Sequence, residues 1–371
     1  MLRSYRHLYI HVPFCAAKCD YCAFYSVPCA DSANLIAGYL DRLEEEIATR
    51  IARCRGLQSI FIGGGTPSIL SPSQLRRLLR TTAGIPRDDN IEITVECNPS
   101  SLDAERIAAL AGCGVNRLSL GIQSWDADLR RTLGRHTELR SPRALVDRIR
   151  AEGIERIGAD LIYAIPGQTT QQWCEDLKRT ADLGVQSLSA YALSIEEGTR
   201  LAAGPEGNRS TDEESAVAMW HSCDAILAPY GLQRYEVSNF AVPGCECRHN
   251  ERIWHGDTYL GCGPAACSFD GESRTANPAD LDAWLNGAAA QADILPPDRR
   301  GAEILAFGLR TTTGWTINEY RKTTGFDPYN LCGDELRTLC AQGLLECTDT
   351  TIRPTQKGLL FADTVCESLL R

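Results

Sequence analysis

The chain has 371 residues, of which 43% are hydrophobic and 23% charged, a length that predicts one large domain and a smaller one. Its net charge of −10 gives it no general electrostatic attraction to nucleic acid or to an anionic membrane surface. The sequence has no apolar run of the roughly 18 residues that a membrane-spanning helix needs.

The cysteine content favours a reducing compartment. The chain has 17 cysteines, an odd number, and its N-terminal segment lacks the pattern of a cleaved signal peptide. A disulfide framework is therefore not expected, and the cytoplasm is the predicted location. Most of the cysteines are scattered singly, and for these we expect the role of small buried apolar residues.

Six short apolar runs predict buried strands, and segments of helical periodicity lie between them. β-Branched residues are common in the first three runs. The predicted strands are 8–12, 59–63, 91–96, 117–122, 157–163 and 187–193. The predicted helices are 33–51, 71–79, 101–112 and 141–153.

Serine begins the last three of these helical segments. Ser71, Ser101 and Ser141 are expected to be N-caps, and the last two segments are expected to end at glycine. Alternation of strands and helices indicates parallel βαβ units. The predicted fold is therefore α/β, an incomplete TIM-like (β/α)6 barrel over residues 1–205.

Two further regions follow the predicted barrel. Residues 206–289 are polar, cysteine-rich and aromatic, with a predicted helix at 212–227 and a close-packed small-residue stretch, "YLGCGPAACSF", at 259–269. Residues 290–371 have helical patterns and then a predicted hairpin at 345–358, which favours a small winged-helix-like module. The module is close to neutral, so a docking or lid role is preferred to DNA binding.

Chemically distinctive residues follow the predicted strands. Cys15, "GGGTP" (63–67), "ECNP" (96–99), "GIQSW" (121–125) and "DLIYAIPGQ" (160–168) lie at or just after strand ends. In a parallel barrel these ends share one mouth. One site there is therefore expected.

Three cysteines lie close together in "FCAAKCDYC", namely Cys15, Cys19 and Cys22. Three thiolates can hold three irons of a cubic iron–sulfur cluster and leave the fourth iron open. Zinc is the main alternative, but structural zinc sites are closed by four ligands, and the sequence offers no second pair nearby. A redox pair would use Cys19 and Cys22 and leave Cys15 unexplained.

The glycines of "GGGTP" allow a ligand to approach the backbone closely, although a tight turn alone would also need them. Glu96, Gln123, Arg135 and Asp160 also lie at or just past strand ends. Singly, each of these polar residues is more often a cap or an ion-pair partner. Jointly, they indicate a site for a zwitterionic nucleoside.

With these motifs together, the chain resembles the radical S-adenosylmethionine (SAM) enzymes. "YIHVPFC", "GGGTPS", "LSLGIQS" and "DLIYAIPGQT" are similar to the oxygen-independent coproporphyrinogen III oxidase family over most of residues 5–270. The resemblance implies a [4Fe–4S] cluster on Cys15, Cys19 and Cys22, with SAM on the open iron and an external one-electron donor. It implies SAM contacts at Tyr9, Tyr21, Gly64, Gly65, Thr66, Glu96, Gln123, Arg135, Asp160 and Ala192.

Departures from the oxidase pattern point to one branch of the family. Phe24 stands where the oxidases have a fourth cysteine, as in the HemW-type haem chaperones. That branch implies haem as ligand and haem-requiring apo-proteins, notably of respiratory chains, as partners. Its H-N-x-x-Y-W motif is similar to "HNERIW", which makes His249 a candidate haem-binding residue but has Ile253 in place of tyrosine.

Two alternatives stay open at this point. Cys267 stands where such chaperones have histidine, which implies either altered haem ligation or a relative without haem chemistry. Cys245 and Cys247 precede His249, and an ordinary surface loop is preferred for them over a ligand role. A catalytic radical SAM enzyme, either a coproporphyrinogen III decarboxylase or a C-methyltransferase, is the alternative to the chaperone. The sequence leaves a homodimer open and does not demand one.

Overall fold

The computed structural model describes residues 4–29, 33–204 and 212–370, and its main element is a twelve-stranded mixed sheet. In sheet order the strands run β14-β13-β12-β11-β1-β4-β5-β6-β7-β8-β10-β9. Their bounds are β1 Tyr5–Val12, β4 Cys54–Gly64, β5 Arg87–Cys97, β6 Arg117–Gln123, β7 Arg156–Tyr163, β8 Ser187–Ala192, β9 Gln233–Arg234, β10 Asn239–Ala241, β11 Tyr259–Cys262, β12 Cys267–Phe269, β13 Arg274–Ala276 and β14 Gln291–Asp293.

The centre of the sheet is parallel. Strands β1, β4, β5, β6, β7 and β8 pair in chain order, and β11 adds a further parallel strand beside β1. In the sheet order β1 and β8 are not neighbours, so the curved sheet does not close on itself. This confirms the predicted incomplete barrel, and each of the six predicted strands overlaps one of the six consecutive parallel strands.

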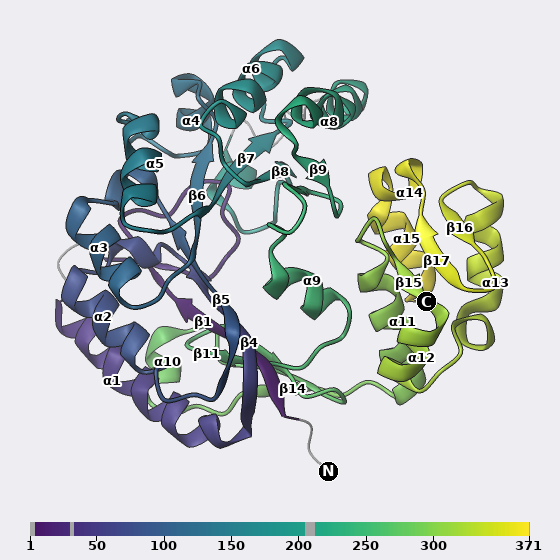
Figure 1. Ribbon diagram of the computed structural model, residues 1–371, viewed down its shortest axis with the longest axis horizontal. Helices are drawn as coiled ribbons and strands as arrows, with labels where there is room; N and C mark the ends of the chain where they lie inside the picture. Colours follow the sequence, from purple (N-terminus) through teal and green to yellow (C-terminus); the bar gives the residue numbers. More distant parts are fainter. Residues whose placement is uncertain (1–3, 30–32, 205–211, 371) are drawn as a thin grey trace.

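Helices cover the outer face of the curved sheet (Figure 1). Amphipathic α1 buries Tyr39, Leu43 and Ile47 against the sheet, as its helical spacing predicts. The helices of this part are α1 Ala33–Arg50, α2 Pro72–Arg80, α3 Ala104–Gly112, α4 Ala127–Thr132, α5 Pro142–Ala151, α6 Thr170–Ala181, α7 Arg200–Ala203, α8 Glu213–Leu227 and α10 Leu281–Leu285.

Only one of the three serine N-caps was predicted correctly. Ser71 accepts a hydrogen bond from the backbone N–H of Gln74 and forms a capping box at α2. Asp103, not Ser101, caps α3, because the preceding three residues form a short 3-10 helix and α3 starts later. Ser141 has φ 45° and ψ 59°, a left-handed conformation in which its side chain makes no cap hydrogen bond.

The region after the barrel returns to the same sheet. Helix α9 (Arg248–Trp254) lies between the sheet and the C-terminal helices (Figure 1), and the small-residue stretch forms β11, a turn and β12. A Cβ on Gly261 would lie 2.0 Å from the carbonyl oxygen of Cys267, so this stretch is close-packed as predicted. The predicted boundary at 205/206 lies outside the described residues, and the three-part division of the chain stays a prediction.

The C-terminal unit has its own hydrophobic cluster, formed around Leu305, Leu336 and Val365 and extended by Phe269 of β12. Its helices are α11 Pro297–Gly308, α12 Ile317–Thr324, α13 Pro328–Ala341, α14 Gln356–Leu360 and α15 Ala362–Leu369, and its small sheet contains β15 Trp315–Thr316, β16 Leu345–Cys347 and β17 Thr351–Pro354. Strands β16 and β17 form the predicted hairpin. Among the described residues, no helix has the length and apolar character to cross a membrane.

Candidate functional site

The three clustered cysteines lie on the loop after β1. Cys15 ends the short strand β2 (Phe14–Cys15), which pairs with β3 (Val27–Pro28), and Cys19 and Cys22 lie on the loop between them. Burial raises the pKa of the Cys22 thiol, and the neighbouring Cys19 and Cys15 raise it further, so the three thiols interact. Within the described ranges, no three His, Cys, Asp or Glu side chains are grouped so that they could hold one metal ion. Three neighbouring thiols on one loop fit a cubic cluster, in which each thiolate binds a different iron.

Neighbouring segments hold this loop. The backbone N–H of Asp20 donates to the carbonyl of Leu133 at 3.0 Å, and the carbonyl of Asp20 accepts from the N–H of Leu201 at 2.8 Å. Arg135 interacts electrostatically with Cys19 and Tyr21 of this loop and donates to the carbonyl of Gly121 at 2.7 Å. Arg135 therefore lies between the cysteine loop and the end of β6, although it is far from that loop in the chain.

The glycine-rich turn after β4 packs directly on the cysteine loop. The N–H of Thr66 donates to the carbonyl of Phe14 at 2.7 Å, and its hydroxyl lies 3.5 Å from the Sγ of Cys15. A Cβ on Gly65 would lie 2.6 Å from the Phe14 carbonyl oxygen. The close approach of the turn to the loop therefore requires glycine at position 65, whereas the predicted approach of a ligand stays a prediction.

Both the backbone conformation of Gly64 and the lack of space around it require glycine there, which a substitution can test. It has φ +109°, and a Cβ there would lie 2.7 Å from the imidazole of His11. We expect Gly64→Ala to reduce the free energy of unfolding by roughly 1–3 kcal/mol, the usual range for backbone strain. Urea denaturation measures this loss.

A helix glycine provides the matched control for this test. Gly38 lies inside α1, and a Cβ added there would have nothing within 4 Å. Gly38→Ala should stabilise the chain by up to about 1 kcal/mol, since alanine is the better helix former. Equal effects of the two substitutions would contradict the constraint at Gly64.

Glu96, at the end of β5, faces the glycine turn. The N–H of Gly64 donates to its Oε2 at 3.1 Å. Burial and, to a smaller extent, the negative charge of Asp160 raise the pKa of Glu96 to about 7, although the Gly64 N–H opposes the shift. A carboxyl group that titrates near neutral pH at a barrel mouth is typical of a functional site.

Asp160 of β7 lies in register with Gly121 of β6. The hydroxyl of Ser119 donates to both of its carboxylate oxygens, at 3.0 and 3.1 Å, and Ser189 lowers its pKa from the neighbouring strand β8. Burial nevertheless raises the pKa of Asp160. The two serines, which the sequence did not reveal as site residues, orient this carboxylate.

The remaining predicted contacts lie around the same mouth. Gln123 is buried and has φ +67° at an irregularity in the pairing of β6 with β7, an uncommon conformation that often marks functional positions. The hydroxyl of Tyr9 lies 3.1 Å from Nδ1 of His11. Ala192 ends β8 at an exposed position, where it has no side-chain polar group to offer.

His249 lies deeper in the barrel, toward the N-terminal ends of the strands. Its side chain is 3% exposed, its Nδ1 is 2.7 Å from the hydroxyl of Ser59, and its ring stacks on Phe61. Burial lowers the pKa of His249 well below its usual value. The imidazole is thus neutral and hydrogen-bonded inside the fold, and its predicted role toward haem stays a prediction.

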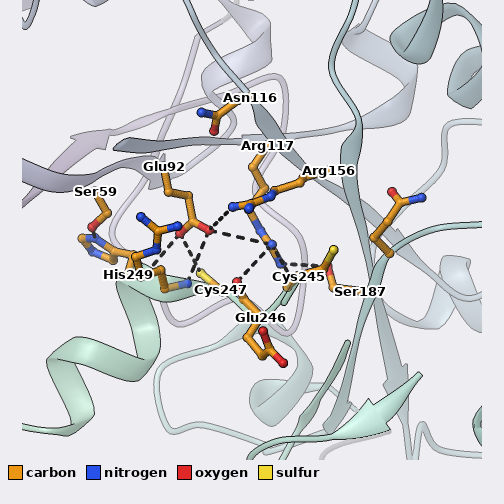
Figure 2. Close-up of polar contacts among 12 residues, drawn as sticks. Ser59, Glu92, Asn116, Arg117, Arg156, Ser187, Cys245, Glu246, Cys247 and His249 are labelled. Atoms are coloured by element: carbon orange, nitrogen blue, oxygen red, sulfur yellow. Dashed lines mark hydrogen bonds and ion pairs between the residues drawn. The ribbon is translucent and has the colours of Figure 1, made fainter. Parts of the chain in front are cut away.

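A buried carboxylate holds the His249 segment in place (Figure 2). Glu92 of β5 is fully buried and accepts hydrogen bonds from the N–H groups of Arg248, at 3.4 Å, and His249, at 3.2 Å. Arg117 and Arg156 lie 3.9 and 3.6 Å from the same carboxylate. Glu92 and Glu96 are four residues apart on β5 and therefore share one face of the strand, so the period of two in "IEITVE" carries the signal for Glu92.

Comparisons with known proteins agree with this arrangement. Residues 9–180 match the family model described as Radical SAM superfamily, and residues 295–361 match the HemN C-terminal domain. The chain is 33% identical over its whole length to the "Heme chaperone HemW" of Lactococcus lactis, covering 98% of that protein. It is 30% identical to the Bacillus subtilis protein of the same name, over 98% of both chains.

An animal relative and a solved structure extend the pattern. The bovine protein "Radical S-adenosyl methionine domain-containing protein 1, mitochondrial" is 32% identical over 98% of this chain and 87% of its own length. The solved structure of coproporphyrinogen III oxidase (HemN) from Escherichia coli superposes with a TM-score of 0.86 over 99% of this chain and 90% of its own, at 23% identity, which shows the shared fold. With an incomplete barrel, a three-cysteine loop and full-length relatives of one name, the chain belongs to the HemW family of radical SAM proteins.

Proposed function

We propose that this chain binds haem and delivers it to haem-requiring apo-proteins, and that its barrel holds a [4Fe–4S] cluster and SAM. The observation that carries the proposal is full-length similarity, at 30% identity or more, to proteins named heme chaperone. Phe24 supports it further, because its apolar ring is 72% exposed beside the cysteine loop, where the oxidases have a thiolate. Respiratory apo-proteins are the proposed recipients.

In this proposal Cys15, Cys19 and Cys22 hold the cluster, which when bound supplies one electron to SAM after an external donor has reduced it. Arg135 fixes the loop that carries two of these thiols. The backbone of Gly64 and Gly65 and the carboxylate of Glu96 line the turn beside Cys15, which suits the charged end of SAM. The other residues carried over by resemblance complete the proposed SAM site: Tyr9, Tyr21, Thr66, Gln123, Asp160 and Ala192.

The proposed location is the cytoplasm. The chain has 17 cysteines, an odd number, which argues against the disulfide framework of a secreted protein. Association into a homodimer stays a prediction, which light scattering tests.

The pKa of Glu96 predicts how SAM binding depends on pH. Asp160 is the titratable group whose charge acts on Glu96, and burial together with Asp160 raises the pKa of Glu96 to about 7. The SAM amino group is a cation and prefers the ionised carboxylate. Affinity for SAM should rise roughly tenfold from pH 6 to pH 8, since the ionised fraction of a group with a pKa of about 7 grows by about that factor.

Calorimetric titration of SAM across this range measures the effect, and Glu96→Gln should remove most of the pH dependence.

The raised pKa of Glu96 also makes the stability of the folded chain depend on pH. Because the folded pKa exceeds the usual value, the contribution of Glu96 to stability is present at acid pH and is lost as pH rises through about 7. If the affinity of Glu96→Gln for SAM depended on pH as in the wild-type chain, Glu96 would be excluded from the SAM site.

One experiment separates the chaperone from a catalytic enzyme. The protein is reconstituted anaerobically, titrated with haem by absorbance, and assayed with coproporphyrinogen III, SAM and a reductant. Stoichiometric haem binding without turnover is the expected result. Turnover, or absence of haem uptake, would reject the chaperone function.

A further inference from the structure

A cavity of about 500 Å³ lies where α9, strands β11 to β13 and helix α11 meet. Its size falls within the range of small-molecule sites. Four aromatic side chains provide much of its lining: Trp254, Tyr259, Phe269 and Phe307. Gly256, just after α9, also lines it, and a Cβ there would lie 3.0 Å from Ile304, so the glycine allows α9 to approach α11 closely.

Two arginines line this aromatic cavity, and one of them, Arg310, gives it an unbalanced positive charge. Arg274 is held by Glu303 through hydrogen bonds of 2.6 and 3.0 Å, so its charge is largely balanced. The guanidinium of Arg310 has no hydrogen bond or ion pair with the residues that the structure describes, and the carboxylate of Glu236 acts on it only at longer range. An apolar ligand that carries carboxylates would satisfy both features of the cavity.

Another cavity among the described residues is less suitable for such a ligand. It measures about 410 Å³ and is lined by Asp224, Arg234 and further residues of α8, β9 and the C-terminal unit, none of them aromatic. Asp224 and Arg234 pair at 2.9 Å, so the arginine there is already neutralised. The carboxylate would repel an anionic ligand.

Helix α9 connects the aromatic cavity to the buried motif histidine. Figure 2 shows His249 turned toward Ser59 at the beginning of α9, whereas Trp254 at the end of the helix lines the cavity. His249 is not among the residues that line it. The two ends of "HNERIW" therefore lie in different surroundings: His249 is buried against Ser59, whereas Trp254 lines the cavity.

We propose that this cavity is the porphyrin site, with the macrocycle against the aromatic walls and at least one propionate on Arg310. The proposal rests on the haem-binding function proposed above and gives it a location. It assigns the binding energy to ring packing and carboxylate recognition, contributions that an axial ligand at His249 would not supply.

The test compares haem with haem dimethyl ester, which has the same ring and iron but no propionate charge. Absorbance titrations use the full-length chain after anaerobic reconstitution. The wild-type chain should bind haem about tenfold more tightly than the ester, the usual range for a charged hydrogen bond. Arg310→Gln should weaken haem binding until the two affinities are nearly equal and leave the ester unaffected, and Arg310→Lys should restore part of the difference.

Arg337→Gln is the matched control, because Arg337 lies on α13 of the same C-terminal unit, is 75% exposed and pairs with Asp334 of its own helix. It should keep the full tenfold preference. Phe307→Ala should weaken haem and ester equally, since it removes part of the apolar wall that both would contact.

The outcomes separate this inference from the proposed function. If Arg310→Gln binds haem and keeps the full preference over the ester, the cavity assignment is wrong and haem binding itself is unaffected. If the wild-type chain binds neither compound, the proposed function fails and the cavity assignment fails with it. A preference that disappears only in the Arg310 variant supports both.

Discussion

Cys19→Ala is expected to abolish assembly of the iron–sulfur cluster. Cys19 lies on the loop between β2 and β3 and interacts electrostatically with Cys22 and Arg135. Loss of a ligand should exceed the roughly 10- to 100-fold loss of affinity that follows removal of an outer hydrogen-bond partner of a metal ligand. Iron and sulfide analysis after anaerobic reconstitution, with the visible absorbance of the cluster, measures the result.

Cys113→Ala is the matched control for this substitution. Cys113 caps the C-terminal end of α3, just before β6, so it lies at the opposite edge of the barrel from the cysteine loop. This variant should retain the full iron content and colour. A Cys19→Ala chain that kept its iron would show that the cluster ligands are wrongly assigned.

Glu92→Ala is expected to cost about 3–5 kcal/mol of the free energy of unfolding, the range for removing one partner of a buried ion pair. Glu92 is fully buried beside Arg117 and accepts the N–H groups of Arg248 and His249. Its removal leaves the buried Arg117 charge without its nearest carboxylate and two backbone donors without an acceptor. Urea denaturation, read by tryptophan fluorescence, gives the change.

The control for this experiment is an exposed ion pair. Glu346 and Arg353 lie 2.6 Å apart on the β16–β17 hairpin, with side chains 53% and 58% exposed. Glu346→Ala should cost less than about 1 kcal/mol, as exposed pairs do. Similar losses in the two variants would contradict the structural importance of Glu92.

The sequence predicted the barrel and its mouth well because both depend on local patterns. Short apolar runs indicate parallel strands, and Gly64 and Glu96 come directly after such runs, so their meeting follows from topology alone. The N-caps were less predictable. Ser101 and Ser141 have the right residue type, but which residue caps a helix depends on backbone dihedrals that a single sequence does not reveal.

The parts that could not be predicted depend on contacts between distant segments. Arg310 and Trp254 are far apart in the chain and meet only because the C-terminal unit packs on β12 and α9. Arg117 contacts Ser187 and the carbonyl of Cys245, which come from two later segments. Neither arginine lies in a motif, so spacing and periodicity carry no signal for them.

The return of residues 245–249 into the barrel has a consequence for how the chain folds. Strands β1 to β8 enclose Glu92 and Arg117, but the N–H groups and carbonyls that satisfy these two charges come from residues made much later. A fragment that ends after β8 would have this polar pair without those partners, and its β1 edge without β11. The six-stranded region should therefore not reach its native state during synthesis until the segment beyond β10 has emerged, which makes the barrel and its extension one cooperative folding unit.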